Sequence, residues 1–238
     1  MSEVKENNTN EKHNLAVKLG FPTDEGCHSM ANLLKDCLSN DDVKQMYSEW
    51  GDTGTYDKSM SNNVYKGPYL VSKAVNDNIP NKNAKILDIA CGTGFVGEHL
   101  KKFGFTNVDG MDAARGMLEN AEKKSAYQNY ICSVIGEGSV HGIPDRTYDV
   151  ITISGGFGPG HITLEAIPEM IELVKPGGFI FNITRKNHLN SFEEYKDKWE
   201  PYIQSLEDAG KWREISRTIF RNYYFEKDGI MFIHEQVQ

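Results

Sequence analysis

Residues 86–97 read ILDIACGTGFVG, an apolar run that passes into a glycine-rich loop. The run is typical of a buried strand, and the loop matches the G-x-G-x-x-G pattern of dinucleotide sites. Gly92 and Gly94 allow the backbone to turn tightly and approach a ligand, and the helix expected after them directs its N-terminal amides toward the same place. The alternative is that these glycines serve only close packing. Asp88 would be costly inside a sheet core without a partner, so we expect it near the strand end, facing a cleft.

The sequence on both sides of this stretch alternates between short β-branched runs and amphipathic segments. The expected strands are KILDIA (85–90), VDGM (108–111), YICSVI (130–135), DVITIS (149–154), FIFNIT (179–184), REISRTIFRNYYF (213–225) and GIMFIHEQVQ (229–238). The expected helices occupy residues 41–50, 69–79, 95–103, 115–124, 168–174 and 190–209. Strands that alternate with helices in this way are typical of a parallel sheet covered on both faces. An Asp-Gly pair at 228–229 indicates a hairpin between the last two strands.

These elements predict the fold class and the domain organisation. We expect an α/β fold with a Rossmann-like, seven-stranded, mostly parallel sheet, a C-terminal antiparallel hairpin, helices on both faces and an N-terminal helical cap. The start of the chain is polar and poor in apolar residues, which predicts a partly disordered tail over residues 1–40. No linker divides the remainder, so residues 41–238 are expected to form a single domain, with the cap helices in 41–80 and the α/β core in 84–238.

Composition and charge limit the expected partners. A net charge of −8 and a pI near 5.4 disfavour nucleic acid, which requires clustered Lys and Arg. No apolar run approaches the roughly 18 residues of a membrane span, and the polar start lacks a signal-peptide pattern. We therefore expect a cytoplasmic protein that binds neither nucleic acid nor membranes, as a monomer or weak homodimer. The four cysteines lack metal-site spacing, so no metal site is predicted.

Two further features lie beyond the glycine-rich loop. Asp112 follows the second expected strand, eighteen residues after Gly94, where a carboxylate can accept hydrogen bonds from both hydroxyls of a ribose. The turn KPGG occupies residues 175–178, just before the fifth expected strand. Both features favour a nucleoside-containing cofactor over a purely structural role for the loop.

Together these motifs resemble the class I methyltransferases that use S-adenosylmethionine. The usual first motif of that family is an acidic residue followed by G-x-G-x-G; here it begins at Asp88, and Ala90 replaces the first glycine. Over residues 43–210, the stretches YSEWGDTGTYD, YKGPYL, ILDIACGTG, GMDAARGMLENA, AIPEM and VKPGG resemble the methyltransferase-like proteins named after the Williams–Beuren syndrome critical region. NAD-dependent oxidoreductases of the Rossmann type lack the acidic residue and the KPGG turn, so that reading is only a distant rival.

The resemblance implies a set of residues that contact S-adenosylmethionine at the carboxyl ends of the strands. These are Tyr47, Tyr56, Asp88, Ala90, Gly92, Gly94, Asp112, Met117, Gly136, Glu137 and Ser154. The backbone around Ala90, Gly92 and Gly94 would hold the methionine moiety. Asp88 would receive its amino group directly or through water, and the alternative role for Asp88 is an internal hydrogen-bond anchor for the loop.

The other implied contacts divide by the part of the cofactor they would meet. Asp112 would bind the ribose hydroxyls, and Met117 would pack against the adenine or its helix. Gly136 and Glu137 would lie near the adenine, unless Glu137 belongs to a solvated turn. Ser154 closes the fourth expected strand, beneath the reactive sulfonium.

An N-terminal segment with its own apolar face is expected to cover this site. Tyr47, Trp50 and Tyr56 would come from this cap, either to cover the sulfonium by a cation–π contact or only to pack the core. Gly51 and Gly54 follow the expected helix and make the join flexible, which suits a lid that orders when the cofactor binds. We therefore expect residues 41–65 to be mobile without cofactor and to close over it, the alternative being a permanently packed helix.

The candidate general base is His161, with His188 as a second choice. Direct methyl transfer from a sulfonium requires mainly alignment of the reacting atoms, and a base is needed only for an acceptor that carries a proton. His161 follows the SGGFGPG loop after the fourth expected strand, where this fold receives the acceptor, and histidine titrates near neutrality. The alternative for His161 is a structural role at the start of a helix.

The sequence favours a small acceptor methylated at nitrogen or oxygen. The fourth expected strand ends in ISGGFG and lacks the Asn/Asp-Pro-Pro-aromatic run of methyltransferases that act on bases or glutamine side chains. A closed cap would limit the acceptor to a small molecule. Two alternatives remain: a methyltransferase with a protein substrate, and a non-catalytic protein that binds S-adenosylmethionine.

Overall fold

The structure, a computed structural model, describes residues 40–52, 56–60, 64–138, 140, 142–158 and 160–238. The tail expected over residues 1–40 therefore lies, apart from its last residue, outside the described part of the chain. Within that part, no helix is long and apolar enough to cross a membrane, and no group of three His, Cys, Asp or Glu side chains is placed to hold a metal ion.

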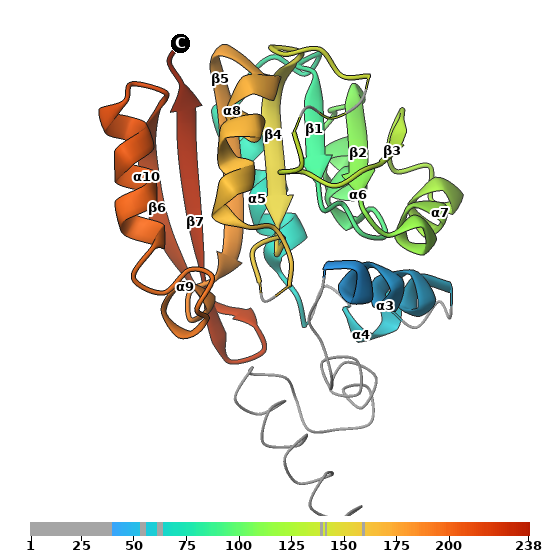
Figure 1. Cartoon of the computed structure of the whole chain (residues 1–238). Coiled ribbons are helices and arrows are strands. Elements are labelled where there is room, and N and C mark those ends of the chain that lie inside the picture. Colours follow the sequence, from blue (N-terminus) through green and yellow to red (C-terminus); the bar gives the residue numbers. More distant parts are fainter. Residues whose placement is uncertain (1–39, 53–55, 61–63, 139, 141, 159) are drawn as a thin grey trace, which may run out of the picture.

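A seven-stranded sheet forms the centre of the molecule (Figure 1). Its strands are β1 (Ile86–Ile89), β2 (Val108–Asp112), β3 (Tyr130–Cys132), β4 (Tyr148–Ser154), β5 (Val174–Arg185), β6 (Trp212–Tyr224) and β7 (Lys227–Gln236), in the order β3-β2-β1-β4-β5-β7-β6. The first five strands pair in parallel, whereas β7 is antiparallel to both β5 and β6. The predicted fold class is confirmed.

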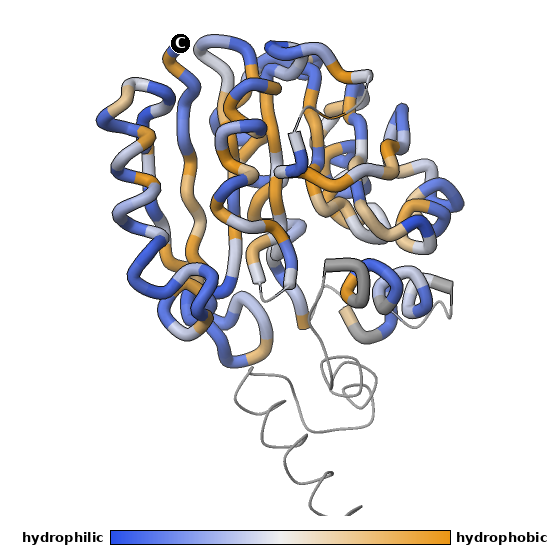
Figure 2. The backbone as a smooth tube through the Cα atoms, viewed as in Figure 1, coloured by the Kyte–Doolittle hydropathy of each residue, from blue (hydrophilic) through white to orange (hydrophobic). Residues whose placement is uncertain are grey.

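Helices cover both faces of the sheet. They are α3 (Asn40–Asp52), α4 (Tyr56–Ser59), α5 (Gly67–Asn78), α6 (Phe95–Lys102), α7 (Arg115–Lys123), α8 (Ile167–Leu173), α9 (His188–Ser191) and α10 (Trp199–Asp208), with the 3-10 helix η1 (Leu164–Ala166) before α8. One apolar cluster joins α5, α6 and α7 to the sheet, and a second joins α8 and α10 to the opposite face. Figure 2 shows hydrophobic residues concentrated along the central strands, as expected where both faces are buried.

Helices α3 and α4 lie beyond the carboxyl ends of the central strands (Figure 1). The strand order reverses between β1 and β4, and open α/β sheets bind ligands at this kind of switch point. The N-terminal helices therefore face the carboxyl ends of the strands. Between them and the sheet lie the glycine-rich loop after β1, the end of β2 and the loop after β4.

Three elements differ locally from their expected bounds. β3 ends at Cys132, three residues earlier than expected, and the single helix expected over 190–209 is divided into α9 and α10. The KPGG stretch is not a separate turn before β5. Val174 pairs with Tyr148 of β4 and Phe179 pairs with Val150, so residues 175–178 between them form a bulge within β5.

The C-terminal hairpin is present, but its turn is not at the Asp-Gly pair. Tyr224 pairs with Lys227, so residues 225–226 form the turn, and Phe225 adopts a positive φ of 49°. Gly229 instead lies inside β7, where an added Cβ would stand 2.5 Å from the Tyr223 ring. Its small size serves the packing of Tyr223, which explains why the expected turn position was wrong.

Candidate active site

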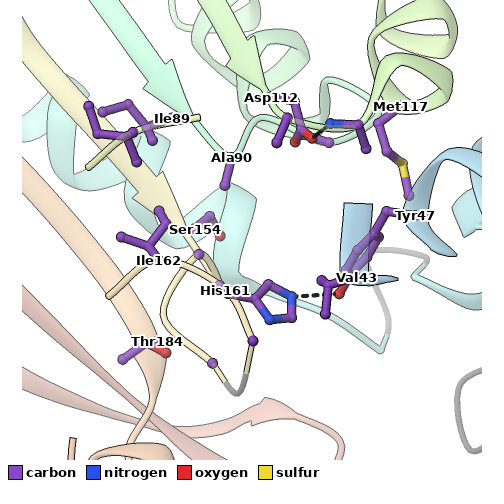
Figure 3. Close-up of a pocket in the computed structure, with 18 of the residues that line it drawn as sticks. Val43, Tyr47, Ile89, Ala90, Asp112, Met117, Ser154, His161, Ile162 and Thr184 are labelled. Carbon is purple, nitrogen blue, oxygen red and sulfur yellow. Dashed lines mark hydrogen bonds between the residues drawn. The ribbon is translucent and has the colours of Figure 1, made fainter. Parts of the chain in front are cut away.

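A cavity of about 260 Å³ lies between the carboxyl ends of the strands and the two N-terminal helices (Figure 3). The cavity has two ends, which we name the β2 end and the β5 end after the adjacent strands. The β2 end includes Gly92, Asp112, Met117, Ile135, Gly136 and Glu137. The β5 end includes Tyr65, Ser154, Thr184, Arg185, His188 and Tyr223. Val43, Tyr47 and Tyr56 line it from the N-terminal helices, and His161 from the loop after β4.

Most of the residues singled out in the sequence line this one cavity. Tyr47, Tyr56, Ala90, Gly92, Asp112, Met117, Gly136, Glu137, Ser154 and His161 are all part of its wall. Asp88 and Gly94 are not. Gly94 caps α6 with a φ of 91°, and a Cβ there would lie 2.6 Å from the Cβ of Ala126. Its place in the structure is at the contact between the start of α6 and the segment that follows α7.

The expectation that Asp88 faces the cleft is wrong. Asp88 is fully buried, and its two carboxylate oxygens accept hydrogen bonds from Tyr127 Oη at 2.5 Å and Thr152 Oγ1 at 2.7 Å. Strand residues alternate between the faces of a sheet, so Asp88 shares a face with Ile86, toward α5 and α6. The carboxylate anchors the glycine-rich loop from within the core, the alternative considered from the sequence.

Tyr127 is held against Asp88 by two glycines. An added Cβ would stand 2.5 Å from the Tyr127 ring at Gly97 and 2.4 Å from it at Gly110. The phenol also accepts a hydrogen bond from the Gly97 amide. The last glycine of the G-x-G-x-x-G pattern therefore makes room for an aromatic ring between α6 and β2, which is a packing role.

The buried carboxylate should make stability depend on pH. Burial raises the pKa of Asp88 to about 7, the hydrogen bonds from Tyr127 and Thr152 lower it, and the charge of Asp112 raises it. Because this pKa is higher in the folded than in the unfolded protein, the contribution to stability is fully present below about pH 4 and is lost as pH rises through 7. We expect the free energy of unfolding to fall by about 2–3 kcal/mol from this group between about pH 5 and about pH 8.

Urea unfolding of the wild type and Asp88→Asn at both pH values checks this expectation. Asparagine does not titrate, so the difference between the two pH values should be smaller in the variant by about the same 2–3 kcal/mol. An identical pH dependence in both proteins would show that Asp88 is ionised throughout this range.

Asp112 links the glycine-rich loop to the end of β2. Its Oδ2 accepts a hydrogen bond from the Gly92 amide at 2.8 Å, and its Oδ1 accepts one from the Ala114 amide at 2.8 Å. Burial raises the pKa of this carboxyl, and the backbone donors counteract that rise. Each carboxylate oxygen has a second acceptor site, so Asp112 can hold the loop and still accept two hydroxyl groups from a ligand.

Ala90 adopts a left-handed conformation, with a φ of 54°, at the position where the family motif has glycine. That conformation costs an L-residue roughly 1–2 kcal/mol relative to its ordinary backbone geometry. The methyl group of Ala90 lines the cavity (Figure 3) and narrows it opposite Gly156, where an added Cβ would lie 3.3 Å away. The turn is therefore retained in spite of the replaced glycine.

The N-terminal helices are joined to the core by close backbone contact and by polar side chains. A Cβ at Gly116 in α7 would lie 2.3 Å from the Ser48 carbonyl oxygen, and Asn120 Nδ2 donates to the Gly51 carbonyl at 2.8 Å. Around α4, Thr93 Oγ1 donates to Asp57 at 2.6 Å, and Asp57 also forms an ion pair with Lys124. Aromatic contacts join Tyr47, Trp50 and Tyr56 to one another.

His161 meets the cap across the cavity. Its Nε2 lies 3.0 Å from Tyr47 Oη, and the two rings form an edge-to-face contact with centroids 5.3 Å apart (Figure 3). Burial is the main cause of a raised pKa for Tyr47, and the charge of Asp112 raises this pKa further. The phenol therefore stays protonated at neutral pH. Tyr195 Oη lies 2.9 Å from the Gly158 carbonyl and 2.6 Å from the Ile162 carbonyl, which fixes the loop that carries His161.

His188 also lines the cavity, but it is a much weaker base than an ordinary histidine. Its Nδ1 lies 3.1 Å from the Phe157 carbonyl oxygen, which can only accept, so Nδ1 carries a proton and donates a hydrogen bond to it. Burial lowers the pKa of His188 to about 3, and the charge of Arg185 lowers it further. An imidazole with so low a pKa is neutral at physiological pH but only weakly basic, so His188 suits hydrogen bonding better than proton abstraction.

Several residues at the β5 end were missed in the sequence. Tyr65 Oη and Ser154 Oγ are 2.8 Å apart, and Tyr223 Oη donates to Tyr65 Oη at 3.2 Å. Arg185 ends β5 and lies over the ring of Tyr224, with 4.0 Å between Cζ and the ring centroid. Tyr223 and Tyr224 come from the C-terminal hairpin, which carries no motif; the only available signal was the YKGPYL stretch, which contains Tyr65.

Comparison with known proteins agrees with this geometry. A family model described as a methyltransferase domain matches residues 86–178. Human methyltransferase-like protein 27 is 34% identical over 171 residues, covering 71% of this chain and 67% of that protein. Demethylmenaquinone methyltransferase of Bacillus licheniformis is 35% identical over 109 residues, covering 42% of this chain and 44% of that enzyme. A TehB-like SAM-dependent methyltransferase of Corynebacterium glutamicum has the same fold, with a TM-score of 0.56 at 13% identity over 81% of this chain and 98% of that one.

The fold, the glycine-rich loop and these relatives place the chain in one family: it belongs to the class I S-adenosylmethionine-dependent methyltransferases. Its cofactor is S-adenosylmethionine. Within the family, its similarity to methyltransferase-like protein 27 associates it with the methyltransferase-like proteins of the Williams–Beuren region.

Proposed function

We propose that this enzyme transfers the methyl group of S-adenosylmethionine directly to a nitrogen or oxygen atom of a small-molecule acceptor. One observation carries the proposal: a single cavity extends from Asp112 at the β2 end to His188 at the β5 end, with Tyr47 and Tyr56 of the N-terminal helices forming part of its wall. Ligands bound at the two ends of one continuous cavity would meet, and the cap limits access by a folded protein.

The residues at the β2 end fit the chemistry of the cofactor. Asp112 offers acceptor oxygens for the ribose hydroxyls, and Gly92, with a φ of 54°, brings its backbone to the cavity wall. Met117 and Ile135 supply an apolar surface for the adenine, and Glu137 is an exposed acceptor beside it. When bound, the cofactor supplies an electrophilic methyl group on a sulfonium.

The β5 end would receive the acceptor. Ser154 Oγ, in its hydrogen bond with Tyr65, lies at the end of β4 and belongs to this part of the cavity wall. We assign His161 as the general base for an acceptor that carries a proton. In the tautomer in which Nε2–H donates to Tyr47 Oη, the Nδ1 lone pair is the basic site.

The cap is expected to order when the cofactor binds. Helix α3 provides part of the cavity wall, so cofactor binding should stabilise its docking on α7, and hydrogen exchange of the Asn40–Asp52 amides should slow with S-adenosylhomocysteine. Helix α10, which does not line the cavity, is the internal reference.

A variant of α7 tests the same docking contact. Gly116→Ala should displace α3 and weaken the binding of S-adenosylhomocysteine, because its added Cβ would collide with the Ser48 carbonyl.

Equal protection of α3 with and without ligand would contradict the lid proposal. The helix would then be a permanent part of the core, and an acceptor protein at an open cleft would become the better hypothesis.

A radiolabelled-methyl screen tests the choice of acceptor class. The enzyme is incubated with tritiated S-adenosylmethionine and either a metabolite fraction or a protein fraction. The proposal predicts label in the small molecules, dependent on His161. Label confined to protein would support the protein-substrate alternative, and cofactor binding without label in either fraction would support a non-catalytic binding protein.

A further inference from the structure

A buried arginine forms part of the β5 end of the cavity, which we call the acceptor end because the proposed function places the methyl acceptor there. Arg185 is the last residue of β5, is only 8% exposed, and lines the cavity. Its guanidinium lies over the ring of Tyr224 at 4.0 Å, a contact that restricts the plane of the charged group. A guanidinium whose plane is fixed in the wall of a ligand cavity is well suited to bind an anionic group of the ligand.

The carboxylates and the guanidinium lie at opposite ends of the cavity. Among the described residues that line it, the carboxylates are Asp112 and Glu137, both at the β2 end, whereas Arg185 lies at the β5 end and a second cation, Lys44, comes from α3. Burial raises the pKa of Tyr47, Tyr65 and Tyr223, and the charge of Arg185 counteracts this rise in all three. The positive field of the guanidinium therefore extends through the acceptor end.

The other walls of this end are aromatic and hydroxylated. Tyr65 makes edge-to-face contacts with both Tyr223 and Tyr224, and Phe192 lines the same end. Rings in this arrangement suit a flat apolar group. The hydroxyl groups of Tyr65 and Tyr223 provide polar contacts for only part of a ligand.

We propose that the methyl acceptor is a small aromatic carboxylate whose carboxylate group is bound by Arg185. The inference rests on the proposed function, because it concerns the acceptor of that same site. The planar guanidinium carries parallel N–H donors whose geometry matches a carboxylate, and its charge attracts an anionic group to this end of the cavity. Arg185 is thus a specificity-determining residue for the acceptor.

Matched pairs of acids and neutral amides test this proposal on the wild-type protein. The probes are benzoate with benzamide and phenylacetate with phenylacetamide, titrated calorimetrically into protein saturated with S-adenosylhomocysteine. A charge-assisted hydrogen bond is worth about 1.5–3 kcal/mol, so at least one acid should bind at least roughly tenfold more tightly than its amide. Equal affinity within both pairs, including no binding by any probe, would overturn the proposal.

Variants then assign the preference to one side chain. Arg185→Met should reduce the affinity of the preferred acid to that of its amide while S-adenosylhomocysteine binds as in the wild type. Arg213→Met, which removes an exposed arginine of β6 paired with Glu235, is the matched control and should change neither affinity. Full acid preference in Arg185→Met would also overturn the proposal.

The design separates the two levels of the argument. If the wild-type protein did not bind S-adenosylhomocysteine, the proposed function itself would be contradicted. If it bound S-adenosylhomocysteine but bound each acid no more tightly than its amide, only the role of Arg185 would be contradicted. The wild-type comparison requires no variant, so it decides the matter even where Arg185→Met lowers the yield of folded protein.

Discussion

Asp112→Ala should weaken binding of S-adenosylmethionine and S-adenosylhomocysteine at least roughly tenfold, because each charge-assisted hydrogen bond to a ribose hydroxyl contributes about 1.5–3 kcal/mol. The structure adds a second consequence. Asp112 accepts hydrogen bonds from the Gly92 and Ala114 amides, so the variant should also have a lower melting temperature without ligand. Isothermal titration calorimetry and thermal unfolding measure the two effects separately.

A control on the same strand separates binding from stability. Asp109 is buried at the other end of β2, where it accepts hydrogen bonds from Tyr148 Oη at 3.0 Å and Asn129 Nδ2 at 2.7 Å. Asp109→Asn should lower stability and leave cofactor affinity unchanged. If Asp112→Ala bound the cofactor as tightly as the wild type, the ribose would have to be held elsewhere.

His161→Asn should lower kcat by roughly 10²–10⁴-fold with the acceptor found in the labelling screen, the contribution typical of a positioned general base. Affinity for S-adenosylhomocysteine should change little, because the predicted loss is in proton transfer. The acidic limb of the kcat/KM profile should disappear in the variant, a change that loss of packing alone would not produce.

His99 provides the matched histidine control. It is buried in α6 beside Tyr69, and it does not line the cavity. His99→Asn should keep the wild-type pH profile. An unchanged kcat in His161→Asn would mean that the acceptor reacts without a base or that another group removes its proton.

The sequence predicts the half of the site that is built from local signals. The glycine-rich loop and Asp112 both lie in the 27-residue stretch 86–112. The strand-loop-helix pattern of this stretch alone places them at the same edge of the sheet. The orientation of Asp88 was missed because the apolar run conceals which face each residue occupies. Strand periodicity puts Asp88 on the face of Ile86, away from the cleft.

The β5 end of the cavity is built from contacts between distant parts of the chain. Tyr65 meets Tyr223 across 158 residues, and Arg185 meets Tyr224 only because β7 pairs with both β5 and β6. No local pattern encodes such contacts. The hairpin turn shows the same limit, since packing of Tyr223 against Gly229 outweighs the local turn preference of the Asp-Gly pair.

Calorimetric titration of the wild-type protein with S-adenosylmethionine and, on the same sample, with NAD tests the central claim most directly. The glycine-rich loop is compatible with either nucleotide by its pattern alone, whereas the family uses S-adenosylmethionine, which we propose binds beside Asp112 in this cavity. The account predicts saturable binding of S-adenosylmethionine and its demethylated product, and no heat from NAD. Micromolar affinity for NAD together with no binding of S-adenosylmethionine would contradict it.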